Sequence, residues 1–462
     1  MSDVNAELLP LADAVTEGWS YRPATNPVKQ VIMRAVAPSV KGLAWGRLLS
    51  DKPLSLDVLI ALLRQASFEA ASGLVISFSH DDYINVGGGV QNVVGDEQAA
   101  LQERGWAYFH VCPNEPKPSL GRLTPAGETH YIANLNGQRI GVVAASDMLH
   151  AVQTLRGESI VLRCIVHHLL GFSPEHVALV IRECGADYPP FVWIHDTFTL
   201  CPSVAMLRNE AVFCGGPAVR SAVCSICHAG LERVDHVARV ARFFQELQPV
   251  ILAPSETILE FWVSRGRYMF KDAHVLPLCK IEFKHKVSDF DAKRPLRVAF
   301  FGSAFFHKGW DTFEALARWH ADDSRYEFFH LGAGVVPVPG VRFVPTLVTR
   351  SNRSAMVESS IASSIDVAVN WSRCYESFSF TAHEALAAGA FLLAPRGAGH
   401  LDRLLSKEYP DLGCLVGSDV ELSALFEEDG LLERVARSPR QSGKLLYGRG
   451  AGELLRMEPV YG

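Results

Sequence analysis

Short apolar runs alternate with stretches of helical spacing along most of this chain. From residue 73 onward, apolar runs occupy 73–79, 106–112, 139–145, 159–168, 191–195 and 249–254. Stretches between them, such as 90–104 and 174–184, carry apolar residues three and four positions apart, as helices do. Buried strands separated by helices are typical of a parallel sheet covered on both faces. The pattern therefore predicts a doubly wound, Rossmann-like α/β domain over 67–282.

A second series of strands follows residue 295. Its apolar runs lie at 296–301, 326–331, 341–344, 365–370, 390–394 and 412–416. The intervening residues 280–295 are charged and end in a proline, which is typical of an interdomain linker. We therefore predict a second Rossmann-like domain over 283–440, with a cleft between the two domains. We expect an N-terminal extension over 1–66, helical around 54–70, and a C-terminal segment over 441–462 that packs back on the first domain.

Composition excludes some partners. The chain of 462 residues is 48% hydrophobic and 20% charged, with a formal net charge of −6, so no bulk attraction to nucleic acid is expected. No apolar run reaches the roughly 18–20 residues of a membrane-spanning helix. The acidic start, MSDVNAELLP, lacks the features of a signal peptide. A cytoplasmic location is expected, with peripheral membrane contact left open.

Four of the ten cysteines fall within 27 residues. Cys201, Cys214, Cys224 and Cys227 have the spacing C-x12-C-x9-C-x2-C in what we interpret as an insertion over 201–227. A CxxC pair with two further cysteines fits a structural zinc site, in which four thiolates leave no open position for chemistry. Ordinary reduced thiols are the alternative interpretation, because a second CxxC pair is missing.

Two glutamates eight positions apart are the strongest candidates for function. In CYESFSFTAHEALAAGAFLLA, Glu376 lies in a Ser/Phe turn and Glu384 lies in a helix-forming run that leads into a strand. The N-terminus of that helix can bind an anion, while the carboxylates suit neutral hydroxyl donors. The alternatives are a solvated loop acid for Glu376 and a capping box, Thr381-x-x-Glu384, for the second glutamate.

A glycine turn followed by a lysine ends the first strand of the second domain. In FFGSAFFHKGW, Gly302 follows the strand and Lys308 precedes a predicted helix. At the carboxyl end of a parallel strand, a lysine there is placed to meet a diphosphate. The alternative is a surface lysine near a helix start.

Two weaker signals lie in the first domain. Gly87, Gly88 and Gly89 follow its first strand and precede a helix, so the backbone there can approach a ligand closely, although a flexible turn would look the same. His195-Asp196 ends a later strand, and His167 and His168 end the one before it. A partly buried histidine oriented by its neighbouring aspartate is the alternative for His195.

Together these residues resemble the retaining glycosyltransferases of family 4, which have the GT-B fold. The resemblance covers residues 73 to 440 and is carried by the E-x7-E pair, the Gly302–Gly309 run, the glycine loop, IHDTFTLCP and APSETILEFWVSRG. It implies transfer of a sugar from a nucleotide diphosphate sugar to a hydroxyl acceptor, such as a glycan, in polysaccharide, lipopolysaccharide or other glycoconjugate synthesis.

The resemblance also implies roles for single residues. Glu376 would contact the transferred sugar and Glu384 the ribose, while His195 would face the sugar or the acceptor. Lys308, helped by backbone amides around Ser377, Phe378 and Ser379, would hold the diphosphate, so no cofactor is expected for catalysis. Ser303 stands where the family places an arginine, and Arg373 is a candidate replacement. A nucleotide-sugar epimerase of the same fold and a non-catalytic nucleotide- or sugar-binding protein with a structural metal stay open as alternatives.

Overall fold

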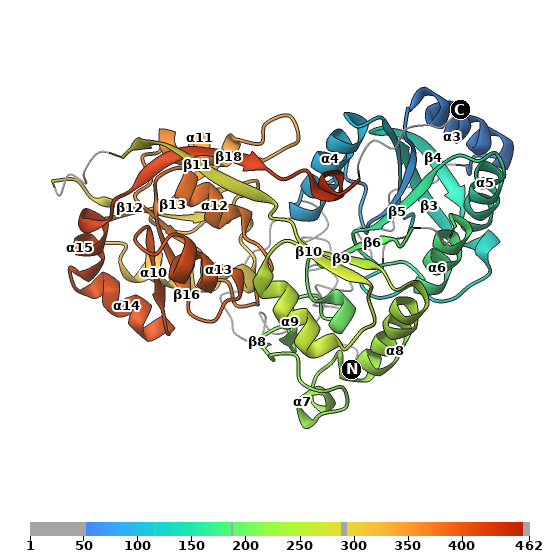
Figure 1. The fold of residues 1–462 in the computed structure, drawn as a ribbon. Coiled ribbons are helices and arrows are strands. Elements are labelled where there is room, and N and C mark those ends of the chain that lie inside the picture. The colour runs from blue at the N-terminus through green and yellow to red at the C-terminus, as the bar shows by residue number, and fades with distance from the viewer. Residues whose placement is uncertain (1–51, 116, 186–187, 288–292, 456–462) are drawn as a thin grey trace. The chain divides into compact units, whose positions relative to one another are not determined.

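The computed structural model describes residues 52–115, 117–185, 188–287 and 293–455 (Figure 1). The chain forms two compact units. The N-terminal unit contains the described residues 52–209, 214–278 and 448–455, and the C-terminal unit contains 210–213 and 279–447. Both units are α/β structures built on parallel sheets, which confirms the predicted fold class of two Rossmann-like domains.

The N-terminal unit is built on one eight-stranded sheet with the order β10-β9-β6-β5-β1-β2-β3-β4. Its strands are β1 (Gly73–Phe78), β2 (Trp106–Pro113), β3 (His130–Leu135), β4 (Gln138–Ala144), β5 (Leu162–Val166), β6 (Phe191–Trp193), β9 (Val250–Ala253) and β10 (Asp272–Val275). The short strand β7 (Leu207–Arg208) lies outside this sheet. All neighbours pair in parallel except β3, which is antiparallel to both β2 and β4.

The prediction of a parallel strand over 139–145 is therefore wrong, because β4 forms a hairpin with β3. Asn136 and Gly137 connect the two strands, with φ angles of 50° and 82°. A two-residue Asn-Gly turn with positive φ at both positions matches the twist of an antiparallel pair. The Asn-Gly dipeptide was the signal in the sequence that could have identified this hairpin.

Helices flank the strands of this unit. They are α3 (Leu56–Glu69), α4 (Gly89–Gln102), α5 (Ala145–Gly157), α6 (Pro174–Glu183), α7 (Ala222–Ser225), α8 (Gly230–Leu247) and α9 (Glu256–Gly266), with the 3-10 turns η1 (Ala126–Glu128), η2 (Phe198–Leu200) and η5 (Gly450–Glu453). The helix expected around 54–70 is α3, and it packs on α5, β1 and β2, so this part of the expected N-terminal extension belongs to the folded unit. The rest of 1–66 lies mostly outside the described residues.

The C-terminal unit is built on a six-stranded, fully parallel sheet with the order β14-β13-β12-β15-β16-β17. Its strands are β12 (Leu296–Phe301), β13 (Tyr326–Gly332), β14 (Val341–Pro345), β15 (Val367–Val369), β16 (Phe391–Pro395) and β17 (Gly413–Val416). All six were predicted. Both faces of this sheet are buried, since Val298 and Phe300 of β12 join one apolar cluster and Ala299 and Phe301 join another.

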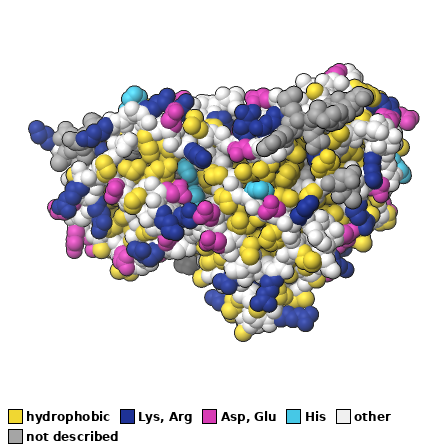
Figure 2. All heavy atoms as spheres, viewed as in Figure 1, with side chains coloured by type: hydrophobic (Ala, Val, Ile, Leu, Met, Phe, Trp, Pro, Cys, Tyr) yellow, Lys and Arg dark blue, Asp and Glu magenta, His cyan; other side chains and the backbone are white. Residues whose placement is uncertain are grey.

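The remaining elements of this unit lie outside that sheet. They are β8 (Val212–Phe213), η3 (Phe306–Lys308), α10 (Trp310–Trp319), α11 (Ala355–Ala362), α12 (Phe380–Ala387), α13 (His400–Arg403), the π turn η4 (Leu404–Glu408), α14 (Asp419–Glu427) and α15 (Gly430–Arg437). Charged side chains of both signs are interspersed over the face drawn in Figure 2, in keeping with the small net charge. None of the helices in the described residues is long and apolar enough to cross a membrane.

The prediction of a linker over 280–295 is wrong for 280–286. These residues belong to β11 (Cys279–Lys286), which pairs antiparallel with β18 (Gln441–Tyr447) (Figure 1). Ile281 and Phe283 alternate with charged residues along β11 and pack on the apolar cluster that includes α12. Alternation of this kind is typical of a strand with one solvated face. Of the segment expected to pack back on the first domain, β18 lies in the C-terminal unit, whereas η5 packs on α4.

Each sheet contains one point where the direction of strand addition reverses. In the N-terminal unit β2 lies on one side of β1 and β5 on the other, and in the C-terminal unit β13 and β15 lie on opposite sides of β12. Ligands of doubly wound sheets bind outside the carboxyl ends of the strands at such switch points. The loops after β1, β5, β12 and β15 are therefore the places to look for function.

Candidate functional sites

The loops that follow β12 and β15 pack against each other at the switch point of the C-terminal unit. Gly302 and Gly309 in the first loop have φ angles of 95° and 83°, which favour glycine. A Cβ on Gly309 would lie only 1.9 Å from the carbonyl oxygen of Trp371 in the second loop. The amide of Arg373 also donates to the carbonyl of His307 at 2.9 Å. This close approach brings Lys308 to Glu376.

Lys308 and Glu376 form an ion pair with a separation of 2.7 Å between Nζ and Oε1. The same carboxylate oxygen accepts a hydrogen bond from Ser372 Oγ at 2.6 Å. The Glu376 side chain is only 6% exposed, so its interpretation as a solvated loop acid is wrong, while that of Lys308 is 41% exposed. Burial opposes the charge of Lys308, but the attraction of Glu376 outweighs it and raises the pKa of Lys308. The lysine is therefore charged and accessible.

The helix that follows this loop begins at a well-defined cap. Ser379 is the N-cap residue of α12, and its Oγ accepts from the amide of Ala382 at 3.3 Å. Asn370, at the end of β15, donates to Ser379 Oγ at 2.9 Å and to Thr381 Oγ1 at 3.1 Å. The N–H groups of the first turn have no acceptor within the helix and carry its partial positive charge. An anion can bind there.

Glu384 lies in the same helix and does not form the capping box, because the N-cap is Ser379 rather than Thr381. Glu384 is only 4% exposed. Burial raises the pKa of Glu384 to about 7, against a smaller opposing effect of Arg353. Across the described parts of the chain, no group donates a hydrogen bond to this carboxylate. A buried carboxylate without donors is costly unless a ligand supplies them.

Other candidates in this unit have structural contacts. The Phe378 ring stacks on both His383 and His400, with ring centroids 4.4 and 4.9 Å away, so its backbone is the part that can meet a ligand. Ser303 is exposed. Arg373, the candidate replacement for an arginine there, donates to Asp311 Oδ2 at 2.7 Å. Ser377 follows Glu376 at the turn into the helix.

In the N-terminal unit, a pocket lies at the carboxyl ends of β5 and β6. It is lined by Val166, His167, His168, Leu169, Val192, Trp193, His195, Asp196, Phe198 and Thr199. His195 Nε2 lies 3.1 Å from Nδ1 of His167. Burial, followed by the neighbouring His167, His168 and His80, lowers the pKa of His195, so this ring is neutral. Asp196 pairs with His168 at 2.9 Å rather than orienting the adjacent His195.

The glycine loop after β1 leads into α4, with Gly88 as the N-cap residue. A Cβ on Gly88 would lie 2.3 Å from the side-chain oxygen of Gln91, whereas a Cβ on Gly87 would meet nothing within 4 Å. Gln91 donates to Asp81 at 2.6 Å, which ties the start of α4 to the end of β1. The contact at Gly88 is with the end of a flexible side chain, so neither Gly87 nor Gly88 is required by its surroundings.

The four clustered cysteines do not form a metal-binding group in this structure. Among the described residues, no three or more His, Cys, Asp or Glu side chains are arranged to hold a metal ion. Arg233 is buried, and its Nη1 donates to Cys224 Sγ at 3.0 Å and to the carbonyl of Pro217 at 2.8 Å. A guanidinium at this distance opposes a second cation at the same thiol. The structural zinc stays a prediction, without support from this arrangement.

Sequence reasoning missed Glu97 and Tyr108, which lie behind the histidine pocket. Glu97 lies in the middle of α4 and Tyr108 in the middle of β2, and both are completely buried. Glu97 Oε1 lies 2.9 Å from His167 Nε2. Neither residue stands in a local motif, so the sequence carried no signal for them.

No family model matches this chain, and no curated protein matches it in sequence. Solved structures do match it at low identity. HepE from Anabaena, in complex with UDP-glucose, is 12% identical, with 79% of this chain and 93% of HepE covered and a TM-score of 0.47. α,α-Trehalose-6-phosphate synthase from Burkholderia multivorans is 13% identical, with 80% of this chain and 89% of the synthase covered and a TM-score of 0.44. TarM is 9% identical, with 79% of this chain and 94% of TarM covered and a TM-score of 0.47.

Proposed function

We propose that this protein is a glycosyltransferase that moves a sugar from a nucleotide diphosphate sugar to a hydroxyl acceptor with retention of configuration. One observation carries the proposal. At the switch point of the C-terminal unit, a charged lysine, the first turn of a helix and two buried carboxylates are contributed by the loops after β12 and β15 and by α12. These groups match the parts of such a donor in charge and in hydrogen-bonding capacity.

The charged groups suit the diphosphate. Lys308 carries three N–H donors, of which the ion pair with Glu376 uses one, so the other two remain for phosphate oxygens. The N–H groups at the start of α12 supply further donors and a partial positive charge. In this proposal they stabilise the leaving diphosphate as negative charge develops on it.

The carboxylates suit the neutral hydroxyls at the two ends of the donor. Glu384 lacks a donor within the described structure, so ribose hydroxyls would satisfy a group whose burial is otherwise unfavourable. Glu376 already accepts from Ser372 and Lys308 at one oxygen, and its other oxygen would accept from hydroxyls of the transferred sugar. In this proposal Glu376 touches the sugar and Glu384 holds the nucleotide.

The proposed chemistry is a front-face displacement. The acceptor oxygen bonds to the anomeric carbon on the side from which the diphosphate departs, and the departing phosphate oxygen takes the acceptor proton. No protein nucleophile is required, and Lys308 and the amides of α12 supply the positive charge. His195 would face the sugar or the acceptor hydroxyl. We place the reaction in polysaccharide, lipopolysaccharide or other glycoconjugate synthesis.

A donor screen followed by product analysis tests the proposal. Purified protein is heated with a panel of nucleotide diphosphate sugars that includes UDP-glucose, and we expect one of them to raise the melting temperature. The anomeric configuration of the product made from that donor is then determined by NMR. Retention supports the proposal, whereas inversion, or a panel without any stabilising donor, overturns it. The exposed Glu433→Gln variant serves as a folded control beside Glu376→Gln.

A further inference from the structure

Two cysteines of the N-terminal unit are in contact at the end of α6. Cys164 lies in the middle of β5, paired with Ile76 of β1, and is 5% exposed. Cys184 is the C-cap residue of α6, and its amide donates to the carbonyls of Val180 and Ile181 at 3.2 Å. The two sulfur atoms are 3.2 Å apart. A strand and a helix end therefore hold this pair in place.

The contact is close enough for a covalent bond to form without a change of fold. Both residues are free thiols. Sulfur atoms in a disulfide are about 2.05 Å apart, so these two have to approach each other by about 1.1 Å. The bond draws the two atoms together and needs no additional space in the core. The native fold therefore places the two thiols where oxidation can join them.

The two thiols differ in access to solvent and in hydrogen bonding. Cys184 is partly exposed, and its Sγ donates to the carbonyl of Val180 at 3.3 Å. Cys164 Sγ donates to Cys184 Sγ. This hydrogen bond, together with burial, raises the pKa of Cys164, so its thiol stays protonated. A dissolved oxidant therefore reacts with Cys184 first, and Cys164 is the second thiol.

We propose that Cys164 and Cys184 form a reversible modification site, at which hydrogen peroxide joins them as a disulfide and a small thiol separates them again. In the first step an S–O bond forms at Cys184 Sγ, the O–O bond of the peroxide breaks, and one water leaves. Cys164 Sγ then bonds to Cys184 Sγ, and the hydroxyl leaves with the proton of Cys164 as a second water. The two thiols lose two electrons and two protons, and the peroxide is reduced to two waters.

Other cysteines of the chain supply the comparison. Cys224 and Cys227, the CxxC pair, are the competing site for a disulfide, so the joined residues have to be identified. Cys112 is the matched control, because it is 1% exposed and lies in β2 of the same sheet. β1 separates β2 from β5. Cys112→Ala therefore removes an equally buried thiol but leaves the Cys164–Cys184 contact intact.

The test is treatment of the full chain with hydrogen peroxide, alkylation of the remaining thiols, proteolysis and tandem mass spectrometry. We expect peptides joined through Cys164 and Cys184 in the wild type and in Cys112→Ala, and their separation by dithiothreitol. In Cys164→Ala the sulfenic acid at Cys184 has no second thiol, so dimedone should trap about 10-fold more of it than in the wild type.

Two results would overturn the proposal. One is oxidation of other cysteines without a bond between Cys164 and Cys184, and the other is an equal yield of dimedone at Cys184 in all three proteins. Should Cys164→Ala fail to fold, the peptides of the wild type decide alone.

The disulfide should also stabilise the fold. The two cysteines are 20 positions apart, so the bond closes a loop in the unfolded chain and should raise the melting temperature by about 3–8 °C. Cys184→Ser, treated in the same way, should show no such increase. A lower melting temperature in the joined protein would contradict the claim that the native fold already suits the bond. None of these results depends on sugar transfer, so each proposal can fail without the other.

Discussion

The ion pair between Lys308 and Glu376 gives a stability test that needs no ligand. Lys308→Met leaves the Glu376 carboxylate buried without its cation, and breaking a buried pair from one side costs about 3–5 kcal/mol. Because Lys308 is partly exposed, we expect a smaller loss of about 1–3 kcal/mol in the free energy of unfolding.

Urea denaturation measures this loss, with Lys444→Met as the control. Lys444 pairs with Glu282 at 3.1 Å, but both side chains are about half exposed. The control should lose less than about 0.5 kcal/mol. Equal losses in the two variants would show that Glu376 does not depend on Lys308.

The raised pKa of Glu384 predicts that the free energy of unfolding depends on pH. Its pKa in the folded protein is about 7, above the unfolded value of about 4.3. The folded state therefore holds more protons between these values, and the free energy of unfolding falls as pH rises from about 4.3 to about 7. Glu384→Gln should remove this slope and stabilise the ligand-free protein above pH 7, by roughly 4 kcal/mol at most.

Deprotonation of Glu384 should lower the free energy of unfolding but increase the affinity for a nucleotide. Hydroxyl groups that donate to Glu384 favour its ionised form, so affinity for the nucleotide should increase as pH rises through about 7 and then level off. Calorimetry at pH 6 and pH 8 measures the change in wild type and in Glu384→Gln. An identical pH dependence in both proteins would remove Glu384 from the site.

Single residues differ in how far the sequence reveals them. Glu376, Glu384 and Lys308 stand in local motifs at strand ends, where type and spacing predict chemistry. Glu97 does not, because its partners His167, Trp193 and Ala451 lie 70, 96 and 354 positions away. Contacts over such separations depend on the fold, and periodicity within α4 shows only that Glu97 is on the buried face.

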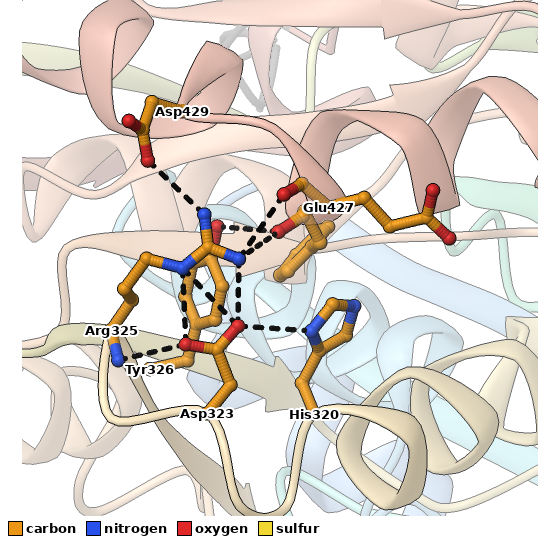
Figure 3. A network of polar contacts seen from close by, with 7 residues as sticks. His320, Asp323, Arg325, Tyr326, Glu427 and Asp429 are labelled. Carbon is orange, nitrogen blue, oxygen red and sulfur yellow. Dashed lines mark hydrogen bonds and ion pairs between the residues drawn. The ribbon is translucent and has the colours of Figure 1, made fainter.

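Among the helices and strands, a polar network joins the turn before β13 to the junction of α14 and α15 (Figure 3). Arg325 donates to Asp323 at 2.8 Å, to Asp429 at 3.1 Å and to the carbonyl of Phe426 at 3.0 Å. His320 Nδ1 lies 3.3 Å from Asp323 Oδ2. The network attaches the last two helices to the sheet.

Disrupting this network should destabilise the C-terminal unit in a pH-dependent way. The hydrogen bond from Arg325 is the main reason that the pKa of Asp323 is lowered to about 2. The contribution of the Asp323–Arg325 interaction to the free energy of unfolding is complete above the unfolded pKa of aspartate, near 4, and is lost as pH falls toward 2. We expect Asp323→Asn to cost about 1 kcal/mol at pH 6, with a smaller difference from wild type at pH 3. Urea melts at both pH values decide this, and a constant difference would contradict it.

A substitution at Gly309 tests the close contact between the loops after β12 and β15. Gly309→Ala would force a Cβ into the carbonyl of Trp371, at a residue whose φ is 83°. We expect a loss of about 2–4 kcal/mol in the free energy of unfolding, together with loss of nucleotide binding. Gly334→Ala is the control, since a Cβ there meets nothing within 4 Å. A Gly309→Ala variant as stable as the control would refute the close approach.

The sequence predicted the parallel strands better than the antiparallel ones. Strands buried on both faces, such as β12 and β16, appear as continuous apolar runs. In β11 the alternation of Ile281 and Phe283 with charged residues resembled a linker, because its partner β18 is about 160 positions away along the chain. The β3–β4 hairpin was missed despite a local Asn-Gly signal.

For the chain as a whole, each unit has its candidate chemistry at the carboxyl ends of parallel strands, at the switch point of the sheet or next to it. The C-terminal unit has a lysine, a helix start and two carboxylates there, whereas the N-terminal unit has a histidine pocket supported by Glu97. Topology explains this placement, since loops after neighbouring parallel strands meet at one edge. The fold class and the first of these sites could be predicted from strand order in the sequence, but the second site only in part.

Calorimetric titration with a nucleoside diphosphate, and with the matching nucleoside, tests whether Lys308 binds the diphosphate of the donor. We expect at least one of UDP, GDP and ADP to bind the wild type and Lys444→Met equally well. We expect Lys308→Met to weaken binding of the diphosphate about 10- to 100-fold while binding of the nucleoside is unchanged. Diphosphate affinity that is the same in Lys308→Met and Lys444→Met, or no binding of any of the three, would contradict it.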